Sequence, residues 1–282
     1  MKANTLSGTT MSEELLIKQI REVDELKALG VTPGLAVILV GEDAASKIYV
    51  RNKERACEKI GIISRTIRLP ADITEQELIA AIEELNVAES IHGILVQLPL
   101  PLGLCENEVL SHVLPEKDVD GFHVVNAGKL FTGQKGTVPC TPKGILYMLK
   151  STGISLCGKE AVIVGRSNIV GKPIAMLLLN ENCTVTICHS KTNDLATVTK
   201  RADILVAAVG RAGFITAEMV KPGAVVIDVG INRVNGKVVG DVDYEEVGEI
   251  ASYITPVPGG VGKMTISMLM QNTLEAAWKK VR

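Results

Sequence analysis

The sequence is poor in aromatic residues and has no excess of charge of either sign. Only 3% of its 282 residues are Phe, Trp or Tyr, and 30 basic residues stand against 32 acidic ones, for a formal net charge of -2. Domains that bind nucleic acids are typically basic and often use aromatic side chains to stack on bases. We therefore expect no nucleic acid among the partners of this protein.

The sequence also lacks the patterns of a metal site, a membrane span and a secretion signal. Its six cysteines include no C-x-x-C pair and its four histidines are scattered, so the spacing of a zinc site is missing, and we expect no metal. No apolar run approaches the roughly 18 residues that a transmembrane helix needs. The first residues are polar, and we expect about ten of them to form a mobile leader. Together these absences predict a cytoplasmic protein that makes no contact with a membrane.

Apolar runs alternate with segments of helical spacing along the chain, which predicts an α/β fold with parallel sheets. The strands expected are Gly34–Val40, Gly93–Leu98, Ala161–Val164, Thr184–Ile187, Ile204–Val209 and Ala224–Val229. The helices expected cover residues 46–60, 74–86, 141–151, 194–201 and 264–281, and one more ends at Leu179. The second of these helices begins with a predicted capping box of Thr74 and Glu77.

Glycine and proline are frequent between residues 115 and 144, where we expect loops and a domain boundary near residue 140. The predicted architecture has two domains. Residues 1–140 form an N-terminal α/β substrate domain, to which a C-terminal helix of about residues 265–282 returns. Residues 141–264 form a Rossmann-like, doubly wound dinucleotide-binding domain.

The segment AVIVGRSNIVGKPIAMLL predicts a strand, a tight turn and a helix. Gly165 lets the chain turn at the end of the strand, and the following helix start offers N–H groups to a pyrophosphate. The usual G-x-G-x-x-G pattern is altered, because Ser167 takes the second glycine position and Gly171 comes one residue late. The context of strand and helix favours a dinucleotide site over a purely structural turn.

The end of the next predicted strand bears on the choice between NAD and NADP. An NAD site usually places an acidic residue there to bind the ribose 2'-hydroxyl. Here the strand ends in His189–Thr192, with the sequence HSKT and no acid, and Arg166 projects from the preceding turn. A guanidinium beside hydroxyl groups suits a 2'-phosphate, so NADP is favoured. The alternative is that Arg166 and Lys191 are ordinary solvated charges.

Polar residues in the first half form a possible catalytic set. Tyr49 and Lys53 are four residues apart on a predicted helix and share a face, although such a pair is usually a solvated surface. Gln97 is a lone amide at the end of an apolar strand, where a buried amide needs hydrogen-bond partners. Asp118 and Asp120 lie in PEKDVDGFH, where carboxylates most often form turns.

Together these segments resemble the bifunctional methylenetetrahydrofolate dehydrogenase/methenyltetrahydrofolate cyclohydrolase family. The similar segments run in the family's order from about residue 35 to about residue 275, and they are YVRNKERACEKIGI, GILVQLPLP, PEKDVDGFH with NAGKL, PCTPKGIL, GRSNIVGKP, HSKT and TPVPGGVG. The resemblance implies two reactions in one cleft. NADP+ takes a hydride from 5,10-methylenetetrahydrofolate, and water opens the methenyl product to 10-formyltetrahydrofolate.

The resemblance also implies roles for individual residues. Lys53 is the catalytic lysine, and Tyr49 is its stacking and orienting partner and a substrate contact. Gln97 hydrogen-bonds and tunes the lysine, and Asp120 grips the amino and ring N–H groups of the pterin. Burial would favour the uncharged amine that a base at position 53 requires. The implied NADP contacts are Gly165, Arg166, Ser167, Ser190 and Ile231. The implied folate loop is Pro258, Gly259 and Gly260.

The chain departs from the family pattern at two positions. Lys263 replaces the proline that many relatives carry in GGVGPMT, and Val124 follows His123 where bacterial relatives often have proline. Neither is a matched catalytic position. Relatives are homodimers that usually pair through their dinucleotide-binding domains, so a homodimer is expected here.

Two other functions remain possible on the sequence alone. One is a different NADP-dependent oxidoreductase of the same architecture, which would use Lys53 as a general acid. The other is a non-catalytic nucleotide-binding or assembly protein, in which Lys53 and Gln97 would be dispensable. The intact long motifs argue against the second.

Overall fold

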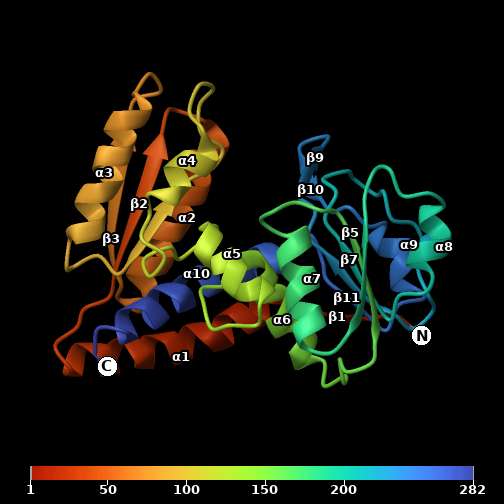
Figure 1. Ribbon diagram of the computed structural model, residues 1–282. Helices are drawn as coiled ribbons and strands as arrows, with labels where there is room; N and C mark the ends of the chain where they lie inside the picture. Colours follow the sequence, from red (N-terminus) through yellow and green to blue (C-terminus); the bar gives the residue numbers. More distant parts are fainter. Residues whose placement is uncertain (1, 282) are drawn as a thin grey trace. The chain divides into compact units, whose positions relative to one another are not determined.

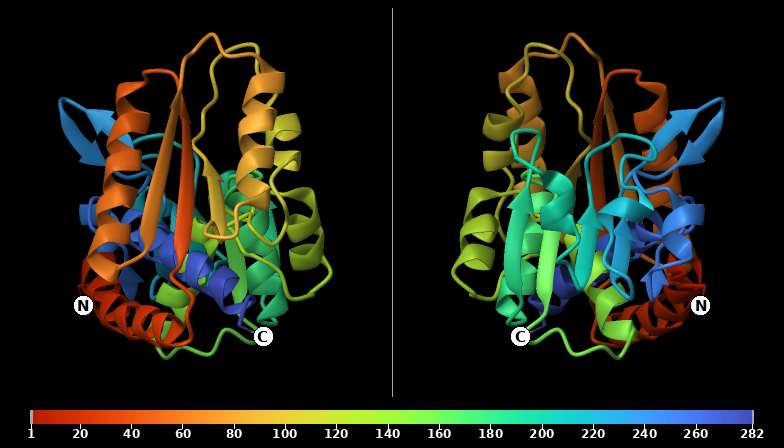
Figure 2. Two further views of the ribbon diagram at one scale, coloured as in Figure 1. Left: turned by 90° about the vertical axis from the view of Figure 1, so that its left-hand side faces the viewer. Right: turned by 90° about the vertical axis from the view of Figure 1, so that its right-hand side faces the viewer.

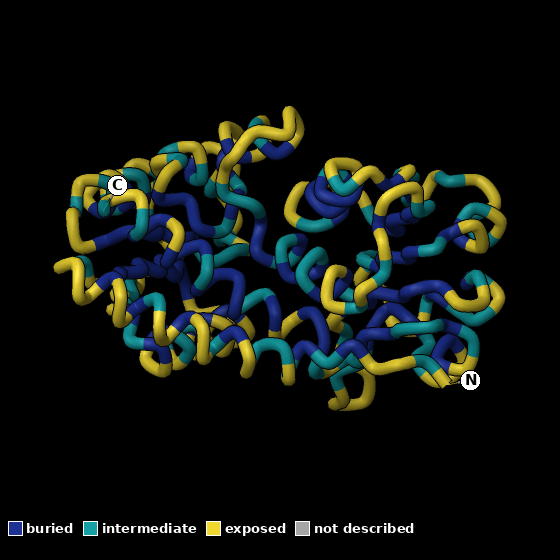
Figure 3. The backbone as a smooth tube through the Cα atoms, turned by 90° about the horizontal axis from the view of Figure 1, so that it is seen from below, coloured by how far each residue is buried: buried dark blue, intermediate teal, exposed yellow. Residues whose placement is uncertain are grey.

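The computed structural model describes residues 2–281, which form two compact units (Figures 1 and 2). We call them the three-stranded unit (residues 14–140 and 266–281) and the six-stranded unit (residues 2–13 and 141–265). Each unit contains a parallel sheet with its own buried interior. In Figure 3 the dark blue, buried stretches run through the inside of each unit and the yellow, exposed stretches form its outer turns.

The three-stranded unit is built on the strand order β3-β2-β4, with all neighbours parallel. Its strands are β2 (Gly34–Val40), β3 (Ile63–Leu69) and β4 (Gly93–Val96). Its helices are α2 (Ala44–Ile60), α3 (Glu75–Val87), α4 (Glu106–Ser111) and α5 (Val124–Phe131), together with most of α1 (Gly8–Ala28) and α10 (Val261–Trp278). The fold class predicted from the sequence is therefore confirmed for this half.

The middle strand explains why a continuous apolar run was visible in the sequence. Every residue of β2 is buried, because helices cover both faces of a parallel sheet. Ala36, Ile38 and Val40 pack with apolar residues of α3, β4 and α4 in one core. The edge strand β3 was not predicted, since its polar residues and mostly exposed or half-buried pattern lack such a run.

Local signals fix the ends of the two long helices beside this sheet. The Asp43 side chain accepts a hydrogen bond from the backbone N–H of Ser46 and so caps α2, which ends at Gly61 with a left-handed φ of 86°. The predicted capping box of Thr74 and Glu77 is present at the start of α3. Both helices begin and end within two residues of the predicted limits.

The six-stranded unit has the strand order β1-β11-β8-β7-β5-β6, and all neighbours are parallel. Its strands are β1 (Asn4–Thr5), β5 (Glu160–Val164), β6 (Thr184–Cys188), β7 (Ile204–Ala207), β8 (Val225–Asp228) and β11 (Tyr253–Ile254). Its other elements are α6 (Cys140–Ser151), α7 (Gly171–Asn180), α8 (Leu195–Thr199), the 3-10 helix η1 (Ala217–Met219), α9 (Tyr244–Gly248) and an antiparallel hairpin of β9 (Asn232–Val234) and β10 (Lys237–Val239).

The chain order of these strands creates a reversal point in the sheet. From β5 the chain passes through α7 to β6 on one side, and then through α8 to β7 on the other side of β5. In doubly wound sheets, ligands bind at the carboxyl ends of the strands that flank such a point. The turns after β5 and β7 therefore define where a dinucleotide would lie.

The N-terminal segment differs from the prediction of a mobile leader. Asn4 and Thr5 pair with Tyr253 and Ile254 as the last strand of the six-stranded sheet, and the backbone N–H of Leu6 donates to the Ile254 carbonyl at 2.8 Å. The leader prediction is wrong because polar residues at a sheet edge need only backbone hydrogen bonds to become ordered. These residues also pack with the six-stranded unit, not with the N-terminal domain to which we assigned them.

The loop-rich stretch of residues 115–144 contains one helix that was not expected, α5, while α6 begins at Cys140, one residue before the predicted helix start. Four of the six cysteines are buried, and no disulfide bond links any of them within residues 2–281. Among residues 2–281, no helix is both long and apolar enough to cross a membrane. The same residues contain no group of three or more His, Cys, Asp or Glu side chains placed to hold a metal ion.

Candidate functional site

The structure brings Lys53 and Gln97 together at one edge of the three-stranded sheet. Lys53 lies on α2, one turn after Tyr49, and Gln97 directly follows β4. The Lys53 amine donates a hydrogen bond of 2.9 Å to the Gln97 side-chain oxygen. The Gln97 amide in turn donates to the Leu98 carbonyl at 2.7 Å, and its backbone N–H donates to the Ile38 carbonyl. Both the backbone and the side-chain amide of Gln97 are therefore held by hydrogen bonds, and its side-chain oxygen faces the Lys53 amine.

Tyr49 keeps its ring available beside this pair. Its side chain is 44% exposed, and it precedes Lys53 on the same face of α2. A ring with nearly half of its surface open to solvent can stack on a planar ligand. Its place is the one expected from the spacing of Tyr49 and Lys53.

The structure gives Asp118 and Asp120 different environments, which their shared loop motif did not distinguish, although the family resemblance assigned only Asp120 to the pterin. Asp118 is buried, and its carboxylate accepts four hydrogen bonds of 2.9 to 3.2 Å, from the backbone N–H groups of Gly121, Phe122 and His123 and from the Asn126 amide. All of its acceptor capacity is used to shape the loop. Asp118 is therefore the turn former that its sequence context predicts.

Asp120 has a different environment. The one hydrogen bond to its carboxylate found among the described residues comes from the Cys140 thiol, at a sulfur–oxygen distance of 3.8 Å. Burial raises the pKa of Asp120 to about 6, while the positive charge of Lys53 acts in the opposite direction. A half-buried carboxylate near an amine, with unused acceptor positions, can bind a ligand that carries paired N–H donors.

Two residues behind Asp120 were missed by the sequence analysis. The Asn272 amide of α10 donates to the carbonyls of Val119 and Val138 at 2.8 and 3.0 Å, and it lies 3.5 Å from the Cys140 sulfur. Cys140 is buried, and its thiol also contacts Asp120. No local sequence pattern predicts this role of Asn272, because its contacts with Val119 and Val138 form only when α10 packs in the three-stranded unit.

In the six-stranded unit, the turn after β5 has the close approach that a dinucleotide turn requires. Gly165 has a φ of 134°, and a side-chain carbon there would lie 2.2 Å from the Ala208 carbonyl oxygen at the end of β7. A side-chain carbon at Gly171 would lie 2.3 Å from the Gly165 carbonyl oxygen. Both glycines are therefore required, and the late position of Gly171 still brings the helix start against the turn.

The backbone donors of this turn lie slightly before the helix start. The Ser167 hydroxyl accepts from the N–H groups of Val170 and Gly171, both at 3.2 Å, so the first donors of α7 are occupied. The backbone N–H groups of Arg166, Ser167, Asn168 and Ile169 have no hydrogen-bond partner among residues 2–281. Consecutive unpaired N–H groups at the end of a central strand form a cradle that fits a pyrophosphate.

The residues expected to select NADP are exposed and unpaired. Arg166 and Ser190 are both open to solvent, and neither has an ion pair or hydrogen bond through its side chain among the described residues. The turn after β6 is shaped by its neighbours, because the His189 backbone donates to the Thr192 hydroxyl at 2.8 Å and the Lys191 backbone to the His189 ring at 3.1 Å. This turn presents hydroxyl and basic groups and no carboxylate.

The loop of Pro258, Gly259 and Gly260 is held by the N-terminal segment. The backbone N–H of Thr9 donates to the Gly259 carbonyl at 3.0 Å, and a side-chain carbon at Gly8 would lie 2.0 Å from the Gly260 carbonyl oxygen. The segment that we expected to be mobile therefore shapes a loop that the family resemblance assigns to folate.

The two departures from the family pattern are structurally mild. Val124 is the first residue of α5, where its side chain is 71% exposed and where proline is also well accommodated. Lys263 is exposed near the start of α10, and its backbone N–H donates to the Gly260 carbonyl at 3.1 Å. A proline at 263 has no backbone N–H and would lack this bond, so the lysine adds one backbone hydrogen bond to the Pro258–Gly260 loop.

Two buried aspartates were also missed. Asp228 ends β8 and Asp241 follows the β9–β10 hairpin, and both are buried. Asp228 did carry a sequence signal, since it is a lone acid in an apolar strand, just as Gln97 is a lone amide. Ile231 lies between Gly230 and Asn232, whose N–H groups these aspartates bind, and its own side chain is 54% exposed.

Comparison with known proteins agrees with this arrangement. Residues 6–120 match the family model of the tetrahydrofolate dehydrogenase/cyclohydrolase catalytic domain, and residues 139–281 match that of the NAD(P)-binding domain. The chain belongs to the tetrahydrofolate dehydrogenase/cyclohydrolase family. The suspected resemblance is confirmed, and so is the predicted combination of a catalytic domain and a nucleotide-binding domain.

Individual relatives span the whole chain. The bifunctional protein FolD of Geobacillus kaustophilus is 58% identical over 98% of both chains. Among solved structures, the methylenetetrahydrofolate dehydrogenase/cyclohydrolase of Campylobacter jejuni covers 99% of both chains with a TM-score of 0.98 and 48% identity. The enzyme of Trypanosoma brucei, solved with NADP and an inhibitor, has a TM-score of 0.95 and 39% identity, and covers 100% of this chain and 99% of its own.

Proposed function

We propose that this chain oxidises 5,10-methylenetetrahydrofolate with NADP+ and hydrolyses the methenyl product to 10-formyltetrahydrofolate. Family membership supports the two activities. The observation that supports the site is the Lys53–Gln97 hydrogen bond of 2.9 Å beside Asp120, whose carboxylate keeps unused acceptor positions. The reaction belongs to one-carbon metabolism, and the family match disfavours both a different oxidoreductase and a non-catalytic binding protein.

In this proposal the folate is oriented by groups with free capacity. The ionised carboxylate of Asp120 accepts hydrogen bonds from the amino group and ring N–H of the pterin, which are parallel donors. Tyr49 stacks on the planar part of the substrate with its exposed ring. The family resemblance assigns the Pro258, Gly259 and Gly260 loop to the folate as well, and the shape of this loop depends on Thr9 and Gly8.

The hydrolytic step rests on Lys53. In its uncharged form, the amine takes a proton from water as the oxygen adds to the methenyl carbon. The protonated amine then gives this proton to the ring nitrogen as the carbon–nitrogen bond opens, while the hydroxyl group on that carbon loses its proton to solvent and becomes the formyl carbonyl. Atoms and charge balance, because one water is added and the positive charge of the methenyl group is lost with one proton to solvent. Gln97 holds the amine through an acceptor oxygen and prevents it from turning away.

The second half supplies the cofactor site. When bound, the nicotinamide of NADP+ accepts the hydride of the one-carbon bridge. The unpaired N–H groups after Gly165 suit the pyrophosphate, and Ser167 fixes the turn that carries them. Arg166 and Ser190 are free to bind a 2'-phosphate, and the exposed Ile231 offers an apolar contact for the nicotinamide.

The direct test is an absorbance assay of the purified chain with 5,10-methylenetetrahydrofolate and either NADP+ or NAD+. Acid then converts the 10-formyl product to the methenyl form, which measures the hydrolytic step separately. We expect reduction of NADP+ and formation of both products. Absence of NADPH formation with this substrate would refute the dehydrogenase assignment.

We also propose that the enzyme is a cytoplasmic homodimer that pairs through its dinucleotide-binding units. The support is the family resemblance. Light scattering of the purified chain measures the oligomeric state, and a monomeric mass at assay concentration would contradict the proposal.

A further inference from the structure

Asp241 binds two separate loops at the carboxyl edge of the six-stranded sheet. One carboxylate oxygen accepts from the backbone N–H groups of Val209 and Gly210 at 2.7 and 2.9 Å. The other accepts from the Arg211 backbone at 2.8 Å and from the Asn232 amide at 2.9 Å. The side chain is fully buried, so one carboxylate joins the turn after β7 to the loop after β8.

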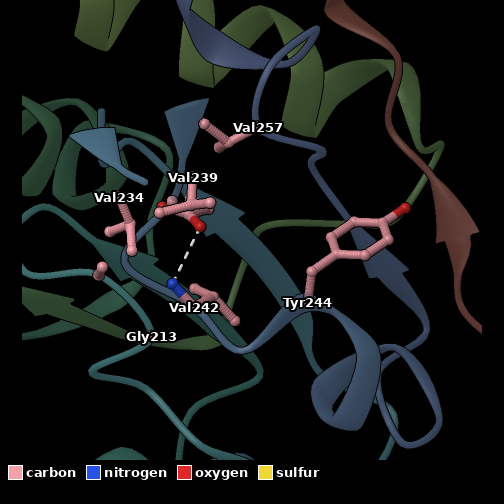
Figure 4. Close-up of a pocket in the computed structure, with 9 residues that line it drawn as sticks. Gly213, Val234, Val239, Val242, Tyr244 and Val257 are labelled. Atoms are coloured by element: carbon pink, nitrogen blue, oxygen red, sulfur yellow. Dashed lines mark hydrogen bonds between the residues drawn. The ribbon is translucent and has the colours of Figure 1, made fainter. Parts of the chain in front are cut away.

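Asp228 supports Asp241 from the other side. Its carboxylate accepts from the backbone N–H groups of Gly230 and Asp241, both at 2.9 Å, and of Val242 at 3.0 Å, the dashed line in Figure 4. The two acids also explain two glycines. A side-chain carbon at Gly230 would lie 2.2 Å from an Asp241 oxygen, and one at Gly240 would lie 1.8 Å from an Asp228 oxygen.

Apolar packing contributes little to holding the β9–β10 hairpin that follows Ile231. The strands of the β9–β10 hairpin contain only exposed and half-buried residues. Beside them lies a cavity of about 360 Å³ lined by Val234, Val239, Val242, Tyr244 and Val257, among others (Figure 4). Where packing is sparse, buried hydrogen bonds decide the conformation. The position of the loop that carries Ile231 therefore depends mainly on the two carboxylates.

We propose that Asp241, backed by Asp228, is a positioning residue for the dinucleotide. It does not touch the cofactor but fixes the turn of Val209–Gly210 and the loop of Ile231 at one mutual spacing. This inference rests on the proposed function, because Ile231 is a proposed NADP contact. The turn after β7 flanks the reversal point, next to Gly165, where the pyrophosphate is expected.

The test uses the fact that all four groups around Asp241 are donors. An asparagine has the same shape but must turn its NH2 group toward two of them, so Asp241→Asn breaks two bonds without changing volume. We expect the dissociation constant of NADPH, measured by fluorescence titration, to rise at least about tenfold. Hydrolysis of methenyltetrahydrofolate requires no dinucleotide, so its kcat and KM should change less than about twofold.

Asp203→Asn is the matched control. Asp203 precedes β7 at the opposite edge of the same sheet, where its carboxylate accepts from the Glu160 backbone at 3.0 Å and from the Lys221 amine at 2.7 Å. Its loss should lower the urea midpoint of unfolding but leave the NADPH dissociation constant within about twofold. An equal rise in that constant for both variants would reduce Asp241 to a general structural role and overturn the proposal.

A second variant tests the geometry directly. Asn232→Asp alone places a carboxylate against Asp241 and should weaken NADPH binding, whereas in the Asp241→Asn background it gives the new amide an acceptor and should restore part of the affinity. We therefore expect Asn232→Asp to weaken NADPH binding in the unmutated chain and to strengthen it in the Asp241→Asn background. If Asp241→Asn does not fold, Asn232→Asp alone decides, and unchanged NADPH binding would overturn the inference. Failure of the unmutated chain to bind NADPH would instead refute the proposed function.

Discussion

The two parallel sheets differ in whether an acidic side chain is left with unused acceptor positions at the edge proposed to bind a ligand. In the three-stranded unit, Asp118 is saturated by four donors, while the one donor found for Asp120 among residues 2–281 is the Cys140 thiol. In the six-stranded unit, both Asp228 and Asp241 are occupied by protein N–H groups, and the groups left open are the N–H donors after Gly165.

This difference follows the charge of the proposed ligands. A pterin presents N–H donors, so an acceptor must stay free to receive it. A pyrophosphate is an anion, so free carboxylates near it would be repulsive, while N–H groups attract it. Counting the occupied acceptors of each buried acid therefore separates residues that bind from residues that support, which residue type alone does not.

The comparison is tested most strongly at the chemical centre of the three-stranded unit. Lys53→Met keeps most of the side-chain volume but removes the amine that Gln97 holds. Loss of a general base typically reduces a rate by about 100- to 10,000-fold, and we expect hydrolysis of methenyltetrahydrofolate to fall by this amount. NADPH binding, measured by fluorescence on the same preparation, should be unchanged. Hydrolysis at the normal rate would show that the base lies elsewhere.

Local sequence patterns were sufficient to predict part of the site in the three-stranded unit. Gln97 stood out as a polar residue in an apolar strand, and Lys53 and Tyr49 share a helix face by spacing alone. The fold of the middle strands was visible for the same reason, since β2 is buried on both faces. These features depend on residues that are close in the chain, and so they can be predicted without coordinates.

The remaining features of both sites depend on contacts between segments that are far apart in the sequence, so local patterns could not predict them. Asp241 binds Val209 across 32 residues, and Asn272 binds the Val119 carbonyl across 153. Asp118 and Asp120 share one local motif, and only the folded loop shows which of them is saturated. The short strand β1 was missed for the same reason, because its order comes from pairing with residues near 254.

The next largest effect is expected at the nucleotide edge. Arg166→Ala removes an exposed guanidinium that has no protein partner among residues 2–281, so little stability should be lost. A charge-assisted hydrogen bond contributes roughly 1.5–3 kcal/mol, which corresponds to about 10- to 150-fold weaker NADP+ binding. The KM for NAD+ serves as the control, because NAD+ has no 2'-phosphate. Equal losses for the two dinucleotides would contradict the assignment of Arg166 to that phosphate.

The smallest effect on ligand binding is expected from the pH dependence that Asp120 imposes. Because burial raises its pKa to about 6, this carboxyl is largely protonated at pH 5 and ionised at pH 7. Only the ionised form accepts two pterin donors, so the dissociation constant of tetrahydrofolate should fall by about tenfold between these pH values. Asp120→Asn should bind more weakly and lose this dependence. An unchanged slope in calorimetric titrations of the variant would assign the titration to another group.

The two aspartates should also change stability in opposite directions. The raised pKa of Asp120 means that the folded state holds its proton more tightly than the unfolded chain does, so stability falls as the pH rises from about 4 to about 6. At pH 7, Asp120→Asn removes this penalty and should raise the free energy of unfolding by about 1–3 kcal/mol. Asp118→Asn sets an NH2 group against backbone donors and should lower that free energy by a similar amount. Urea denaturation of both variants measures the signs directly, and destabilisation by both would mean that Asp120 supports the fold as Asp118 does.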